Sequence, residues 1–139
     1  MADSVFVDSN VFIAAANGSD NLHARAISVL EECARSGDEL ITSNYVVSEA
    51  LTILSMRGSK KLALSFAEII YNSSSAIVRV NVDPEIEHRA LELFSIVTSK
   101  NISFCDCVSV AIVELYRIPV IASFGADFKK FKERFIIRG

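Results

Sequence analysis

The chain has 139 residues, of which 51% are hydrophobic and 22% charged, with five glycines and two prolines. This length and composition predict one globular domain spanning residues 1–139 and exclude a disordered or linker-rich chain. The formal net charge of −3 excludes a strongly basic protein that wraps nucleic acid, but an enzyme with an acidic catalytic centre stays possible.

The N-terminus has no positively charged stretch followed by an apolar one, and no run of about 18 apolar residues occurs. We therefore predict a cytoplasmic protein with no membrane span. The three cysteines, Cys33, Cys105 and Cys107, are odd in number and irregularly spaced, which favours a reducing compartment. With only His23 and His88 available as partners, we interpret the cysteines as small buried hydrophobes, not as zinc ligands.

Taken in chain order, the apolar run at residues 5–8 ends in an acid and has no polar alternation, which predicts a strand buried on both faces. Asp20 or Asn21 caps a helix to about Ser36, and Gly37 ends it. The patterns then predict a strand at 40–42, helices at 44–56 and 60–71, a strand at 77–80, helices at 83–99 and 103–116, a strand at 120–123, a short helix from 127 and an edge strand at 135–137. This alternation predicts an α/β protein, a three-layer α/β/α sandwich with a mostly parallel central sheet.

Three carboxylates stand in apolar surroundings. Asp8 ends the first predicted strand, Glu49 faces an apolar stripe of its helix, and Asp106 lies in a helix that is apolar nearly all round. Isolated buried carboxylates cost several kcal/mol. No lysine or arginine is close to any of the three in sequence. If they converge at the carboxyl ends of the strands, a shared divalent metal satisfies all three, and oxygen ligands favour Mg²⁺ or Mn²⁺.

Each acid also has a structural interpretation, and these stay open. Asp8 can cap a helix that begins near Val11, and Asp106 lies in the first turn of its helix, where an acid is favoured. Glu49 can face solvent if the phase of its helix differs from our assignment. A shared metal would explain all three acids at once, whereas the structural interpretation needs a separate explanation for each acid.

Four segments together resemble the motifs of PIN domains. They are residues 6–13 (Phe-Val-Asp-Ser-Asn-Val-Phe-Ile), 42–51 (Thr-Ser-Asn-Tyr-Val-Val-Ser-Glu-Ala-Leu), 104–111 (Phe-Cys-Asp-Cys-Val-Ser-Val-Ala) and 121–128 (Ile-Ala-Ser-Phe-Gly-Ala-Asp-Phe). The resemblance covers about residues 4–137, and the size of the chain is most similar to VapC-type toxins of prokaryotic toxin–antitoxin pairs.

The resemblance implies an endoribonuclease that hydrolyses RNA phosphodiester bonds with Mg²⁺ or Mn²⁺. Asp8 and Asp106 would bind the metal directly, and Glu49 directly or through water. Asn10 would position a carboxylate or the scissile phosphate, and Ser123 would hydrogen-bond Asp8 or a metal water; ordinary loop capping is the alternative for both. It also implies a homodimer and a small antitoxin partner.

One departure from the family pattern concerns the fourth acid. Gly125 stands where the family usually has this acid, and the nearest carboxylate is Asp127. Asp127 either serves as a displaced fourth catalytic acid or caps the short helix that follows.

Two rival functions follow from the same residues. A haloacid-dehalogenase-like phosphatase needs a second aspartate two residues after its nucleophile, where this chain has Asn10. A catalytically degenerate PIN module that binds RNA or a partner protein is the second rival, and Gly125 is the feature that favours it.

Overall fold

A computed structural model describes residues 2–125, 127–131 and 136–139, with the side chains of Asp127 and Lys130 outside that description. The elements are β1 (Ser4–Val7), α1 (Ser9–Ala16), α2 (His23–Arg35), β2 (Glu39–Ser43), α3 (Asn44–Arg57), α4 (Lys60–Tyr71), β3 (Ile77–Val80), α5 (Pro84–Ile96), α6 (Phe104–Leu115), β4 (Val120–Ala122), the 3₁₀ helix η1 (Asp127–Phe131) and β5 (Ile136–Arg138).

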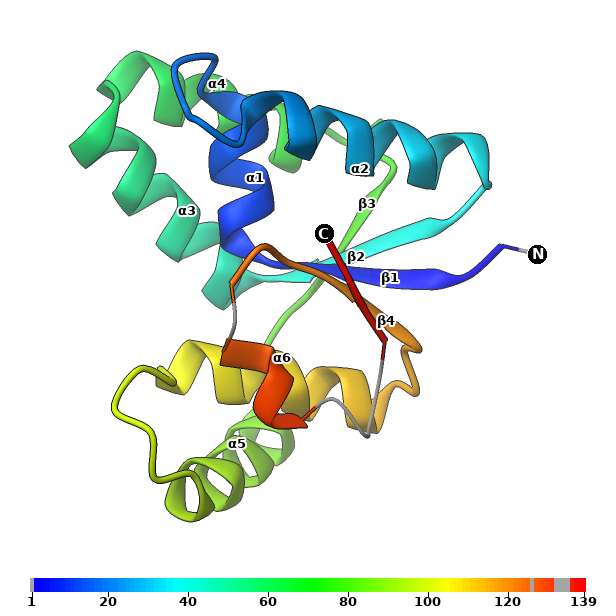
Figure 1. Ribbon diagram of the computed structural model, residues 1–139, viewed down its shortest axis with the longest axis vertical. Helices are drawn as coiled ribbons and strands as arrows, with labels where there is room; N and C mark the ends of the chain where they lie inside the picture. Colours follow the sequence, from blue (N-terminus) through cyan, green and yellow to red (C-terminus); the bar gives the residue numbers. More distant parts are fainter. Residues whose placement is uncertain (1, 126, 132–135) are drawn as a thin grey trace.

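The described strands form one sheet in the order β3-β2-β1-β4-β5, and every neighbouring pair is parallel. Figure 1 shows α1, α2 and α4 on one side of the sheet and α5 and α6 on the other, which confirms the predicted three-layer α/β/α sandwich. The sheet is parallel throughout its described strands, where we predicted a mostly parallel one. No helix in this part of the chain is long and apolar enough to cross a bilayer.

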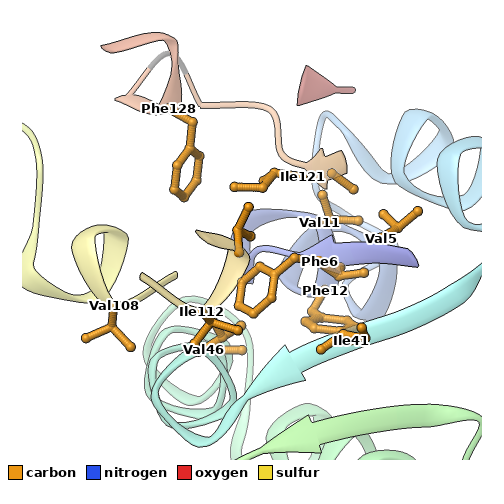
Figure 2. Close-up of a cluster of buried hydrophobic side chains, with 14 of the residues drawn as sticks. Val5, Phe6, Val11, Phe12, Ile41, Val46, Val108, Ile112, Ile121 and Phe128 are labelled. Atoms are coloured by element: carbon orange, nitrogen blue, oxygen red, sulfur yellow. The ribbon is translucent and has the colours of Figure 1, made fainter. Parts of the chain in front are cut away.

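The central strand β1 explains the core. Val5, Phe6 and Val7 are fully buried, because helices cover both faces of a parallel sheet. Phe6 packs in the cluster of Figure 2, which gathers aliphatic and aromatic side chains from strands and from helices of both layers. The prediction of a strand buried on both faces is confirmed.

Local signals set most element boundaries. Gly37 has a φ of +72°, the left-handed conformation that glycine adopts after a helix, and α2 ends before it as predicted. Ser43 caps α3 by accepting a hydrogen bond from the N–H of Val46 at 3.1 Å. Asp83 likewise caps α5, which has Pro84 as its first residue.

Several elements differ from prediction. Helix α2 begins at His23 with Leu22 at its N-cap and no side-chain cap, so the prediction that Asp20 or Asn21 caps it is wrong; Asp20 instead accepts from the N–H of Leu22 in the turn before the helix.

Residues 9–16 form helix α1 with Asp8 at its N-cap; the patterns along the chain did not predict this helix, because an uninterrupted apolar run shows no helical period, but the capping alternative for Asp8 placed a helix start near Val11. Helix α5 ends at Ile96, short of residue 99. The last strand is Ile136–Arg138, and Phe135 lies outside the described residues.

The chain order of the strands creates a switch point. The chain passes from β1 to β2 and β3 on one side of the sheet, whereas β4 and β5 lie on the other side of β1. In open parallel sheets, ligands bind beyond the carboxyl ends of the strands at such a point. Asp8 follows β1 and Ser123 follows β4, so both stand at the switch point.

Candidate active site

Asp8 is a buried carboxylate at the carboxyl end of β1. Its side chain is 6% exposed, and it caps α1, with Oδ1 accepting from the N–H of Ser9 at 2.8 Å. The pKa of Asp8 is raised from its ordinary value of 3.8 to about 7, chiefly by burial and to a smaller extent by the charges of Asp106 and Glu49, while hydrogen bonds from Ser9 and Ser123 lower it. Asp8 therefore caps a helix and, at the same time, stands where burial and neighbouring negative charges disfavour its ionised form.

Glu49, on α3, contacts the residue that follows Asp8. The hydroxyl of Ser9 donates to Glu49 Oε2 at 2.5 Å, and the Cys105 thiol lies 3.8 Å from the same oxygen. Glu49 is half-buried, so its surroundings are less enclosed than we expected from its apolar helix. The Ser9 contact ties Glu49 to the residue that follows Asp8, although 40 positions separate the two in sequence.

Asp106 lies in the first turn of α6. Its Oδ2 accepts from the Ser103 N–H at 3.0 Å while its own N–H donates to Ser103 Oγ at 3.0 Å, which is a reciprocal capping box. Asp106 is half-buried, although the helix behind it is interior, with residues 107–113 all buried. Its charge nevertheless acts on Asp8. The capping role and proximity to the other acids occur together.

Asn10 and Ser123 connect the two central strands. Ser123 Oγ donates to Asp8 Oδ2 at 3.0 Å and accepts from Asn10 Nδ2 at 3.1 Å. Asn10 Oδ1 in turn accepts from the N–H of Phe124 at 3.2 Å. Both side chains therefore orient the loop after β4 and, through Ser123, the carboxylate of Asp8.

Asp127 is the candidate for the fourth acid of the family pattern. Asp127 is the first residue of η1, but its side chain lies outside the described part of the chain, so its catalytic role stays a prediction. At the family's usual position, the N–H of Gly125 donates to Ser123 Oγ at 3.2 Å.

Two residues of the site were missed from sequence. Ser9 orients Glu49, and its position between Asp8 and Asn10 in the first motif was the available signal. Cys105 is half-buried, not the enclosed hydrophobe that we expected. Burial and the charges of Glu49, Asp8 and Asp106 raise the pKa of its thiol well above the ordinary range, so it stays protonated.

The donor chemistry suits a hard cation, because the acids offer only oxygen. Within the described residues, no three His, Cys, Asp or Glu side chains form a group that could hold a metal ion by themselves. Mg²⁺ keeps several waters and is commonly bound through one or two carboxylates together with substrate phosphates. Asp8 and its neighbouring acids fit that kind of site and not an all-protein cage.

Fold, motifs and site geometry agree with one family. The family model described as "PIN domain" matches residues 5–134, and the chain belongs to this family. It is 30% identical over 125 residues to the 23S rRNA-specific endonuclease VapC20 of Mycobacterium tuberculosis strain CDC 1551 / Oshkosh, covering 89% of this chain and 91% of that protein.

Solved structures of related proteins share the fold of this chain. The crystal structure of Mycobacterium tuberculosis VapC20, described as a sarcin-ricin loop cleaving toxin, has a TM-score of 0.82 and 27% identity, covering 92% of this chain and 95% of that one. The FitAcB structure from Neisseria gonorrhoeae has a TM-score of 0.68 at 15% identity, covering 97% and 96%, and shows the shared fold alone.

Proposed function

We propose that this protein is an endoribonuclease of a toxin–antitoxin pair, acting on structured ribosomal RNA in the cytoplasm, with residues 1–139 working as a single domain. The carrying observation is that Asp8 stands at the switch point and that the charges of Glu49 and Asp106, from two distant segments, act on it, with Glu49 bonded to the neighbouring Ser9. The similarity to an endonuclease specific for 23S rRNA supports the substrate class.

We assign metal binding to Asp8 and Asp106 directly and to Glu49 directly or through water, with Asp127 as a further candidate. A bound Mg²⁺ or Mn²⁺ would lower the pKa of water and neutralise charge on the phosphoryl oxygens. A cation near Asp8 would also offset the burial and the repulsion that together hold the pKa of this carboxyl near 7, because opposite charge favours the ionised form.

The chain's own residues orient these acids. Ser123 and the N–H of Ser9 each hold one oxygen of Asp8, and the Ser9 hydroxyl holds Glu49. Asn10 uses its amide on Ser123 and Phe124, which favours the role of positioning Asp8 over that of binding phosphate. In hydrolysis the water oxygen bonds to phosphorus, the bond to the leaving ribose oxygen breaks, and the proton lost by water is balanced by the one the leaving oxygen gains.

The test is cleavage of an RNA stem-loop with the sarcin-ricin sequence, with Mg²⁺, Mn²⁺ or a chelator present. We expect cleavage with either metal and none with the chelator, and Asp106→Asn purified identically controls for contaminating nucleases. Binding of the RNA without cleavage in any metal would instead establish the degenerate PIN module, for which Gly125 is the motivating feature.

Exposed apolar side chains support the proposal that this protein binds a second copy of itself and an antitoxin. Met56, Leu64, Ile69 and Tyr71, on α3 and α4, are 78%, 60%, 65% and 52% exposed, and exposed apolar patches commonly mark protein interfaces. Of these, Ile69 also lines an apolar pocket of about 340 Å³, together with Phe12, Leu62 and Phe66. A protein of the same fold from Klebsiella pneumoniae, solved as a toxin–antitoxin complex, supports an antitoxin partner, and we also propose a homodimer.

Sedimentation tests these partners. We expect a dimer at micromolar concentration, and Leu64→Glu should weaken assembly of the homodimer or the antitoxin complex because it buries a charge in an apolar interface. A wild-type monomer would contradict the homodimer, and a coexpressed neighbouring small protein that does not copurify would contradict the antitoxin pairing.

A further inference from the structure

An acidic site that cuts RNA has an electrostatic problem at its entrance. Asp8, Glu49 and Asp106 repel the phosphates of the substrate, and the whole chain carries a net charge of −3. One metal ion offsets part of this charge. Binding of the flanking nucleotides calls for a protein cation held close to the loops that carry the acids.

Arg25 is such a cation. It stands in the first turn of α2 and is exposed, yet its guanidinium has a defined position, 5.0 Å from the centroid of the Phe124 ring. Its Nη2 also donates to the carbonyl of Gly139 at 2.8 Å. Within the described residues no Asp or Glu side chain forms an ion pair with Arg25. Its exposed guanidinium is therefore not neutralised by an acidic side chain of this part of the chain, and its remaining N–H groups are available to a ligand.

The aromatic partner of Arg25 is fixed to the active site. Phe124 follows Ser123 directly, and its N–H donates to Asn10 Oδ1 at 3.2 Å. Ser123 bonds Asp8, and its own N–H donates to the carbonyl of Arg138 on β5 at 2.9 Å. Helix α2, the loop after β4 and the C-terminal segment thus meet at the loop that bonds Asp8, in the region between α2 and β4 in Figure 1.

The packing of this junction is tight. A Cβ on Gly139 would overlap the carbonyl oxygen of Ser123 and lie 3.3 Å from the Phe124 ring. The backbone of the last strand therefore supports the loop directly, and the loop in turn supports the ring under Arg25. Such support fixes a binding group before the ligand arrives, which reduces the ordering cost of binding.

We infer that Arg25 and Phe124 form an RNA-binding subsite next to the acids, in which the guanidinium binds a backbone phosphate and the ring stacks on a neighbouring base. This inference rests on the proposed ribonuclease function. A guanidinium placed over an aromatic ring keeps its N–H edge available for phosphate oxygens, and aromatic rings stack on bases irrespective of sequence. Arg25 is thus a substrate-positioning residue.

The alternative is a purely structural contact that ties α2 to the loop. Arg25→Ala separates the two when compared with Arg35→Ala, a matched control, because Arg35 is an exposed arginine in the last turn of the same helix. We expect Arg25→Ala to raise KM for the sarcin-ricin stem-loop about tenfold with kcat nearly unchanged. Arg35→Ala should leave both constants at the wild-type values.

Salt dependence gives a second readout. Loss of one phosphate contact lowers the slope of log affinity against log salt by about 1. We expect this loss in Arg25→Ala, whereas Arg25→Lys should keep the slope and recover KM only in part, because lysine keeps the charge but not the planar fork. Phe124→Leu should weaken binding without changing the slope.

Binding is measured on uncleaved RNA in the Asp8→Asn background, with and without Arg25→Ala, so that it does not depend on catalysis. If the wild type cleaves RNA but Arg25→Ala keeps the wild-type KM and salt slope, the subsite is wrong and the function stands. If the wild type does not cleave, the function fails, and an unchanged slope or absent binding removes the subsite as well. A lower melting temperature with unchanged binding would establish the structural contact instead.

Discussion

Ser123 donates its hydroxyl hydrogen to Asp8 at 3.0 Å, across the junction between two neighbouring strands and over 115 positions of sequence. The acceptor is more buried than Glu49 and Asp106, and the bond lowers a pKa that burial raises. This contact links the end of β4 to the end of β1, and the same loop carries Phe124.

Removal of that hydroxyl should be felt in both stability and activity. For Ser123→Ala we expect a loss of about 1–3 kcal/mol in the free energy of unfolding, because a buried carboxyl loses a donor and Asn10 loses a partner. The cleavage rate should fall about tenfold as Asp8 loses its orientation. Ser95→Ala, which removes an exposed hydroxyl bonded within α5, is the control for melting and cleavage, and equal behaviour of the two variants would show that Ser123 is an ordinary loop residue.

The raised pKa of Asp8 predicts how stability depends on pH without metal. Its folded pKa is about 7 against an ordinary 3.8, so between these values the unfolded chain releases a proton that the folded chain keeps. The free energy of unfolding should therefore fall as pH rises from about 4 to about 7, by up to a few kcal/mol. Thermal melting in chelator, wild type against Asp8→Asn, isolates this contribution. The difference between the two should grow with pH in favour of the variant, and a difference that stays constant would contradict the raised pKa.

Divalent metal should reverse that instability. Mg²⁺ or Mn²⁺ that binds only the folded chain stabilises it by about 2.7 kcal/mol at a hundredfold excess over Kd. We expect the melting temperature of the wild type to rise with metal at pH 7.5, and the rise to disappear in Asp8→Asn. An equal shift in both proteins would place the bound metal elsewhere.

Asp106 combines a helix cap with a proposed metal ligand, and asparagine separates the two functions. Asn can still accept from the Ser103 N–H, so Asp106→Asn should keep the fold and, without metal, be as stable as the wild type or more so, because repulsion of Asp8 is relieved. Cleavage should fall by roughly two orders of magnitude or more. Asp83→Asn, at the capping position of α5, is the matched control and should keep full activity. If melting of Asp106→Asn drops by many degrees while metal-dependent cleavage survives, Asp106 is a structural acid.

Much of the fold could be predicted because its signals are local. The apolar run before Asp8 predicts a buried strand whatever surrounds it, Asp83-Pro84 predicts a helix start, and Gly37 predicts a helix end, since each depends on the conformational preferences of a few adjacent residues. The same holds for the placement of Asp8 at a strand end.

The tertiary structure alone decided how the site is assembled. Whether Glu49 reaches Ser9, whether Ser123 reaches Asp8 and whether Arg25 lies over Phe124 depends on strand order and helix packing, which bring together residues 40 to 115 positions apart. Burial was decided in the same way. The apolar sequence around Glu49 and Asp106 predicted enclosed acids, but both are half-buried on their helices, α3 and α6, because the exposure of a side chain depends on which neighbours the fold places over it.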